Sequence, residues 1–356
     1  MKFSAKSSDL AAVLASGLKM VDKTKSVGIL ADKKNGTTLR LMDDTGCYFH
    51  SSFPSKVEKG GHFSIGLDIL QALTKAKNLE MEYAVADSKL SIKSLNSRMS
   101  GKDVPLLTDD VVLAEQSKAG VSFGKYQSKA LLMMSECAIP SFFQKVLPQY
   151  IVANKGVLTV ACADIMFSAI ATYPVEKLVL TETCIPAQYA KLMREVVGDS
   201  CNISLKKDKL VIDTDIVHTE LPMIQMDAIA TIDKILALDS GKSVSSFMVE
   251  TQLLRSELDN ILVVYEDKSP IQIKLKNNLS LLYRTNRGTF NSTVKVESLQ
   301  GASEFFLDVE MFRTILGKCS GKIKVELKKS VLVLTTCPIK NLYIKYVIAL
   351  VNPGEN

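Results

Sequence analysis

Residues 307–334 read LDVEMFRTILGKCSGKIKVELKKSVLVL, and two other stretches of the chain repeat their pattern without a gap. These stretches are residues 65–92, IGLDILQALTKAKNLEMEYAVADSKLSI, and residues 185–212, IPAQYAKLMREVVGDSCNISLKKDKLVI. In each copy, apolar residues recur first at helical spacing and then at alternate positions, which indicates a one-faced helix followed by a half-buried strand. Internal repetition is stronger evidence of architecture than any short motif, so this pattern predicts the fold.

Three looser copies complete a series of six units with a period of roughly 60 residues. The units begin at Phe3, Phe63, Phe123, Ile185, Phe247 and Phe305. Two units together make a domain of about 120 residues, a usual size for one hydrophobic core. The sequence therefore predicts an α+β protein of three domains, which span residues 1–115, 116–241 and 242–356. The connectors around residues 106–118 and 226–242 are not rich in Pro, Gly or Ser, so we expect a fixed arrangement of the domains.

The composition is that of an ordinary globular chain, with 47% hydrophobic and 23% charged residues. No stretch approaches the length of a membrane span, and the first residues, Met1 to Ser4, lack the apolar core of a signal peptide. We therefore expect a cytoplasmic protein without a membrane partner. The seven cysteines lie far apart with no Cys-x-x-Cys pair, which favours buried free thiols over metal ligands or disulfides.

The sequence offers little for catalysis. Its three histidines have no metal-binding spacing, and we expect them to face solvent on strands: His50, His62 and His218. A P-loop is absent because the residue five positions before Gly241, where the motif requires its first glycine, is Leu236. No glycine-rich dinucleotide motif follows a strand either. We therefore expect no catalytic site, no metal and no cofactor, leaving open only an enzyme whose site is assembled from distant residues.

Basic residues recur on the faces of the expected helices that lie opposite the apolar residues. Singly, each is typical of a solvated helix face. Together, on equivalent helices lining one surface, they would form a continuous track for phosphates, suited to sequence-independent and salt-sensitive binding of duplex DNA. On the fifth helix, Arg255 is expected to pair with Asp259 one turn away. The candidate DNA-binding residues are Lys19, Lys23, Lys75, Lys77, Lys125, Lys129, Lys191, Arg194, Arg255, Arg313 and Lys318.

Helix packing then favours one assembly. Helix axes lie about 8 to 10 Å apart when helices pack. Six helices in a closed ring would leave only about 8 Å clear, whereas twelve would leave roughly 26 Å, just wider than a duplex of about 20 Å. One chain therefore cannot encircle DNA, but two can, and a head-to-tail homodimer would close without open sheet edges.

Over essentially its whole length the chain resembles the beta sliding clamp of bacterial-type DNA polymerase III. The resemblance is carried by the three domains, the opening Met-Lys-Phe before a helix, the repeated strand–helix–strand blocks, and the apolar strand from Tyr343 to Val351. It implies a DNA-clamp fold in which each domain has two inner helices and outer antiparallel sheets, closing as a homodimeric ring. It also implies a non-enzymatic processivity factor that encircles duplex DNA, tethers the replicative DNA polymerase and is opened by a clamp loader.

The same resemblance implies a partner-binding cleft between the second and third domains. The residues that it places there are Ile165, Phe167, Pro222, Val347, Ile348, Leu350 and Val351. Two departures predict different partner peptides: residues 164–168 read DIMFS where the family has Asp-Gly-His-Arg-Leu, and residues 352–356 extend the apolar ending. The formal net charge of +6 differs from the acidic exterior expected of the family and would suit a divergent replisome, in a bacterial cell or a virus-infected one.

A second interpretation belongs to another class of protein. The same fold could serve as a non-encircling nucleic-acid-binding scaffold or as a virion component. A stable dimer distinguishes the ring from this alternative, because a single chain has too few helices to surround a duplex.

Overall fold

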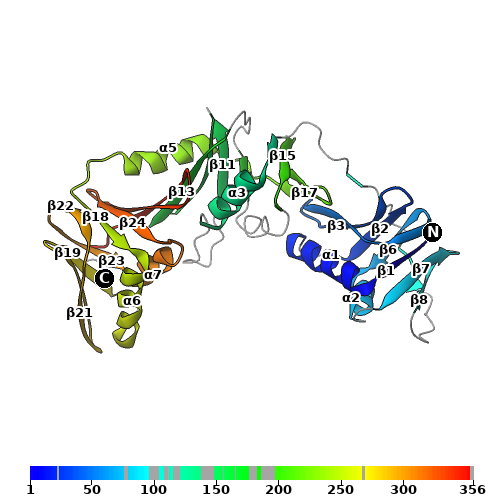
Figure 1. Cartoon of the computed structure of the whole chain (residues 1–356), viewed down its shortest axis with the longest axis horizontal. Helices are drawn as coiled ribbons and strands as arrows, with labels where there is room; N and C mark the ends of the chain where they lie inside the picture. Colours follow the sequence, from blue (N-terminus) through cyan, green and yellow to red (C-terminus); the bar gives the residue numbers. More distant parts are fainter. Residues whose placement is uncertain are drawn as a thin grey trace. The chain divides into compact units, whose positions relative to one another are not determined.

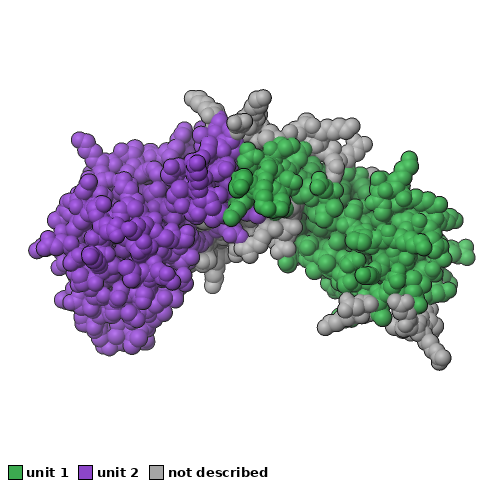
Figure 2. Space-filling view, viewed as in Figure 1, with its two compact units in different colours: residues 1–129, 192–224 green, residues 130–191, 225–356 purple. Residues whose placement is uncertain are grey.

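The chain forms two compact units in the computed structural model, and Figure 2 colours them separately. Unit 1 contains residues 1–129 and 192–224, and unit 2 contains residues 130–191 and 225–356. The residues that the structure describes are 1–21, 24–75, 79–95, 104–107, 111, 113–114, 121–137, 148–154, 156–164, 166–175, 183–185, 197–266 and 269–352. In each unit, one sheet joins strands of two neighbouring expected domains. The two units therefore do not test the division into three domains, which stays a prediction.

Unit 1 contains two antiparallel sheets. The smaller has the order β5 (Lys56–Lys59), β1 (Lys2–Lys6), β7 (Glu80–Ala86), β8 (Lys89–Ser94) and β9 (Val104–Pro105). The larger has the order β10 (Val121–Phe123), β15 (Cys201–Lys206), β16 (Lys209–Asp213), β17 (Val217–Pro222), β4 (Tyr48–Phe53), β3 (Gly36–Met42), β2 (Ser26–Asp32) and β6 (Gly61–Gly66). The pairing of β17 with β4 joins strands of the first and second expected domains into one sheet.

Two helices of unit 1, α1 (Ser7–Met20) and α2 (Leu67–Thr74), lie side by side (Figure 1). Helix α1 packs closely on the larger sheet because it presents Gly17 to it. A methyl group on Gly17 would lie 2.5 Å from Leu41 Cδ1 and 2.8 Å from Phe49 Cδ1. Such overlap is costly in a packed core, so this glycine permits the close approach of helix and sheet.

Unit 2 is also built on two antiparallel sheets. The larger has the order β14 (Thr183–Ile185), β11 (Gln149–Asn154), β12 (Val157–Ala163), β13 (Phe167–Pro174), β26 (Leu342–Ala349), β25 (Val331–Ile339), β24 (Lys322–Leu327), β18 (Ser245–Glu250) and β22 (Glu297–Gln300). The smaller has the order β21 (Gly288–Val294), β20 (Leu279–Thr285), β19 (Pro270–Leu275) and β23 (Ser303–Asp308). The pairing of β13 with β26 joins the second and third expected domains.

Helices α6 (Thr251–Ile261) and α7 (Val309–Leu316) of unit 2 pack against each other (Figure 1). Their buried residues recur at helical spacing, as the sequence predicted, and include Leu254 and Leu258 on α6 and Phe312 and Ile315 on α7. A short 3-10 helix, η1 (Leu262–Val264), continues α6. Helix α3 (Lys125–Cys137) contains the boundary between the two units.

A further helix, α5 (Ala228–Asp239), lies within residues 226–242, which were predicted to be a connector between domains. It is capped by Asp227, whose side chain accepts a hydrogen bond of 2.8 Å from the backbone N–H of Ala230. Its buried residues pack on the nine-stranded sheet in a core cluster that includes Ala228, Ile232 and Ile235. The connector is therefore an ordered part of unit 2.

The strand–helix repeat is confirmed for five of the six units, since β1, β6, β10, β18 and β23 each lead into a helix. The sixth unit begins at Ile185 in β14, and the helix expected after it lies outside the described residues.

Candidate nucleic-acid interface

The helices of unit 1 carry exposed lysines opposite their buried faces. Lys19 lies in the last turn of α1, and Lys75 is the C-cap of α2. Both are exposed, while Leu14 of α1 and Leu70 of α2 are buried. Lysines at helix C-termini also interact favourably with the helix dipole. Two further candidates on these helices, Lys23 and Lys77, lie outside the described residues.

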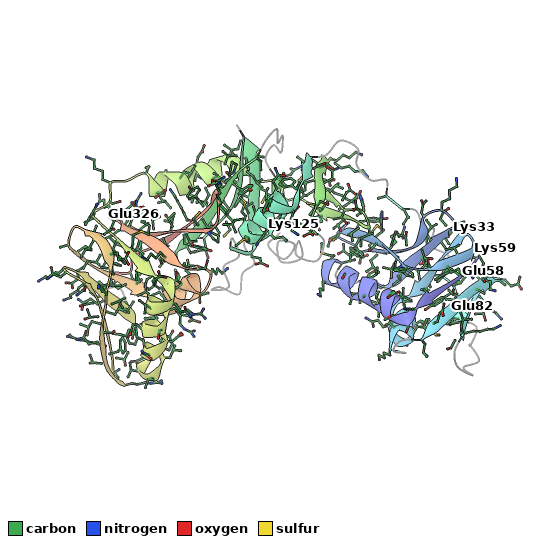
Figure 3. All side chains as sticks on the ribbon, in the orientation of Figure 1. Lys33, Glu58, Lys59, Glu82, Lys125 and Glu326 are labelled. Atoms are coloured by element: carbon green, nitrogen blue, oxygen red, sulfur yellow. The ribbon has the colours of Figure 1, made fainter. Side chains whose placement is uncertain are left out.

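Helix α3 presents Lys125 and Lys129 one turn apart, and both are exposed. Its buried residues include Leu131 and Met134, as the periodicity predicted. Lys125, labelled in Figure 3, has its Nζ 3.4 Å from Asp199 Oδ2, and both side chains are largely exposed. Such surface pairs are worth little, so a phosphate can readily replace the carboxylate.

The helix pair α6–α7 differs from the sequence prediction in one pairing. Asp259 accepts a hydrogen bond of 2.5 Å from Nε of Arg313 on α7, rather than pairing with Arg255 on its own helix. Arg255 is exposed and makes no ion pair within the described part of the chain. The expected Arg255–Asp259 pair is therefore wrong, because the packing of α7 on α6 supplies Arg313 as the partner of Asp259.

The remaining basic candidates are less accessible or not described. Lys318 is half-buried, and its Nζ lies 3.5 Å from the backbone oxygen of Glu136. Lys191 and Arg194 lie outside the described residues.

The residues predicted to bind a partner fall into two groups. In unit 2, Phe167 and Ile348 are directly opposite each other in the pairing of β13 with β26, and both are buried. Val347 is buried as well, whereas Leu350 and Val351, which follow β26, are half-buried. Pro222 belongs to unit 1 and is half-buried, and Ile165 lies outside the described residues. Among the unit 2 residues of this set, Leu350 and Val351 offer an accessible apolar surface.

Two of the three histidines do not face solvent, contrary to the prediction. His50 on β4 and His218 on β17 are buried, whereas His62 is exposed. The prediction failed because β17 pairs with β4 and places the two rings directly opposite each other, where they stack. The Tyr48 hydroxyl forms a hydrogen bond of 3.0 Å with His50 Nδ1 and accepts another of the same length from the backbone N–H of Ala114.

Charged groups surround His218. Its Nδ1 donates to Asp213 Oδ1 at 2.5 Å, and its Nε2 lies 3.6 Å from Glu220 Oε1. Burial raises the pKa of Glu220, but hydrogen bonds from Lys209 and Lys206 outweigh that effect and hold the pKa at about 2. The carboxylate therefore stays ionised, and this network links side chains of β15, β16 and β17 within the larger sheet of unit 1.

Within the described residues there is no group of three or more His, Cys, Asp or Glu side chains that could hold a metal ion. No described helix is long and apolar enough to cross a membrane. Four cysteines are buried free thiols, as predicted, and burial raises the pKa of Cys162 to about 12. Cys319 is half-buried and Cys337 is exposed, so the expectation of burial is wrong for Cys337.

Comparison with solved structures identifies the fold. No family model and no curated protein matches the chain. The DNA polymerase sliding clamp from Bacillus subtilis matches with a TM-score of 0.83 and 13% identity, covering 99% of each chain. The DNA polymerase III subunit beta from Pseudomonas aeruginosa matches with 0.80 and 15%, covering 99% of this chain and 100% of that one. The sliding clamp from Caulobacter crescentus matches with 0.78 and 12%, with the same coverage. The chain therefore has the fold of bacterial DNA polymerase III beta sliding clamps over its full length, as the sequence predicted.

Proposed function

We propose that the protein is a DNA sliding clamp, a processivity factor that encircles duplex DNA and tethers a replicative DNA polymerase. The observation that carries this proposal is the full-length match to sliding clamps combined with exposed basic residues on the repeated helices. At 11–15% identity the match defines the fold, so the basic helices supply the independent argument for DNA. Lysine and arginine without base-reading partners suit phosphates of any sequence.

The protein acts as a homodimer in this proposal, because six helices cannot surround a duplex and twelve can. An apolar surface beside an open sheet edge supports self-association. Leu262 and Val263 of η1 are 46% and 85% exposed, and η1 contacts β21, the edge strand of the four-stranded sheet. Exposed apolar residues next to an unpaired edge are typical of a surface that another chain covers.

The polymerase and the clamp loader are expected to dock on the accessible apolar residues that follow β26. The protein itself catalyses no reaction and needs no cofactor. Its place is on DNA in the cytoplasm of a bacterial cell, or of a bacterial cell infected by a virus.

A retention experiment tests this function. The protein is incubated for hours with nicked circular DNA, so that a ring can open without a loader, and is then separated from free protein by gel filtration. We expect co-elution with circular DNA and release when the DNA is linearised, because a ring slides off an end. Equal retention on both forms would favour the open scaffold, and light scattering should give about twice the chain mass of 39.0 kDa.

A matched pair of double variants tests the basic helices. Replacing Lys19 and Lys75 by Gln should lower retention and its salt sensitivity, since each lost phosphate contact reduces the slope of log affinity against log salt by about one. The control replaces two exposed lysines of unit 1 that Figure 3 labels away from α1, Lys33 in the turn after β2 and Lys59 at the end of β5. Equal loss in both variants would contradict a role for the helices.

A further inference from the structure

The cations of the α6–α7 helix pair are not equivalent. Arg313 on α7 is held by Asp259 on α6 through a 2.5 Å hydrogen bond from Nε. Arg255, one turn before Asp259 on α6, has no carboxylate partner in the described part of the chain. The two helices pack against each other (Figure 1), and Asp259 follows Arg255 by four residues on α6, which is about one helical turn.

The bond to Asp259 competes with DNA for Arg313. A guanidinium binds carboxylate and phosphate oxygens with the same N–H groups, so Nε cannot serve both at once. The pair is also accessible to a polyanion, since the side chains of Arg313 and Asp259 are 37% and 43% exposed. A phosphate that bonds to Nε must therefore first displace Asp259, which weakens the contact of Arg313 with DNA without preventing it.

Asp259 also lowers the potential around Arg255. One helical turn is well within the screening length of about 10 Å at 0.1 M salt. A carboxylate at that distance repels the phosphates that Arg255 would attract. The helix pair therefore carries two arginines but binds phosphates less strongly than two arginines without a neighbouring carboxylate would.

We propose that Asp259 is a positioning residue that withholds Arg313 from phosphates and so keeps the contact of this helix pair with duplex DNA weak. A sliding protein must break its phosphate contacts at each step, and weak contacts let it move. This inference rests on the proposed clamp function.

The test is Asp259→Asn, which removes the charge but keeps an oxygen that can accept from Arg313 Nε. Affinity for a short fluorescent duplex is measured by anisotropy across a salt series. We expect Asp259→Asn to bind the duplex more tightly than wild type. Its affinity should also fall more steeply between about 50 and about 200 mM salt, by an additional factor of about 3.5 for each arginine released. The reason is that one phosphate contact adds about 0.9 to the slope of log affinity against log salt concentration. Asp259→Glu, which retains the charge, should behave like wild type.

Asp233→Asn provides the matched control, because Asp233 is an exposed carboxylate on α5 with no ion pair in the described residues. It changes the net charge equally and lies on neither α6 nor α7. Equal gains from Asp259→Asn and Asp233→Asn would overturn the proposal in favour of a general charge effect. Unchanged affinity in Asp259→Asn, with wild type binding DNA normally, would overturn the proposal alone. Failure of wild type to co-elute with nicked circular DNA would overturn the proposed function as well.

Two arginine variants test the same idea without altering Asp259. In the wild-type background, Arg255→Gln should reduce affinity and salt slope more than Arg313→Gln, because Arg313 is already engaged. In the Asp259→Asn background the two substitutions should cost similar amounts. If Arg313→Gln costs as much as Arg255→Gln in wild type, Asp259 does not withhold Arg313.

Discussion

The imidazole rings of His50 and His218 stack across the pairing of β4 with β17, with ring centroids 4.9 Å apart and ring planes at 19°. The two strands come from the first and second expected domains, so the stacked pair lies on the seam that joins them within unit 1. Both rings are buried, and Arg40 is the residue directly opposite His50 on β3. A second positive charge here would be costly, because within the described part of the chain the His50 ring bonds to the Tyr48 hydroxyl and not to a carboxylate.

The stability of unit 1 should therefore depend on pH. Burial, followed by the neighbouring His218, lowers the pKa of His50 to about 4, whereas the unfolded chain has an ordinary value of 6.5. Between these values the unfolded state binds the proton and the folded state does not, so stability is full above about pH 6.5 and is lost as the pH falls toward 4. The loss is on the order of 3 kcal/mol, from 1.36 kcal/mol per pKa unit.

Urea unfolding of wild type and His50→Gln at pH 7.5 and pH 4.5 measures this effect. The glutamine variant should lose less stability on acidification, since it has no imidazole to protonate. His62→Gln, which removes an exposed histidine, should follow the wild-type curve. Parallel curves for wild type and His50→Gln would show that His50 does not cause the pH dependence.

The repeat allowed most of the fold to be predicted, because apolar periodicity depends on local sequence. Helix α5 lies outside the repeat, so the repeat does not predict it. Its local pattern does, because Ala228, Ile232 and Ile235 recur at helical spacing after the capping residue Asp227.

The candidate site was less predictable, because it depends on contacts between distant residues. Asp259 is separated from Arg313 by 54 residues, and local spacing suggested Arg255 as its partner instead. Burial of Phe167 and Ile348 likewise follows from the pairing of β13 with β26, which a single sequence does not specify. The sequence indicates which residue types could bind DNA or a partner, whereas packing determines which of those residues are accessible.

The proposed dimer predicts a specific role for Val263. Replacing this exposed residue by Glu should leave the chain folded, since the side chain is already 85% exposed, but should oppose association by placing a charge in an apolar contact. Light scattering at micromolar concentration should then give the mass of one chain. Leu238→Glu on α5, where the native residue is 50% exposed, is the matched control and should remain dimeric. A dimer unaffected by Val263→Glu would exclude η1 from the interface.

The C-terminal segment predicts separable effects on partner docking and stability. Leu350 and Val351 are half-buried and held by their backbones, through N–H bonds of 3.1 Å to Ser330 O and 3.0 Å to Phe306 O. Alanine at both positions keeps these bonds and removes apolar side chains, so the fold and DNA retention should persist while stimulation of the cognate polymerase is lost.

Ile348→Ala supplies the contrast, because Ile348 is fully buried on β26 opposite Phe167. It should lower the free energy of unfolding by about 2 to 5 kcal/mol through the cavity it leaves. Primer extension by the cognate polymerase on singly primed circular DNA, alongside urea unfolding of each variant, measures both effects. If the double variant stimulates extension as wild type does, the partner docks elsewhere. If it unfolds as readily as Ile348→Ala, Leu350 and Val351 belong to the core rather than to a docking surface.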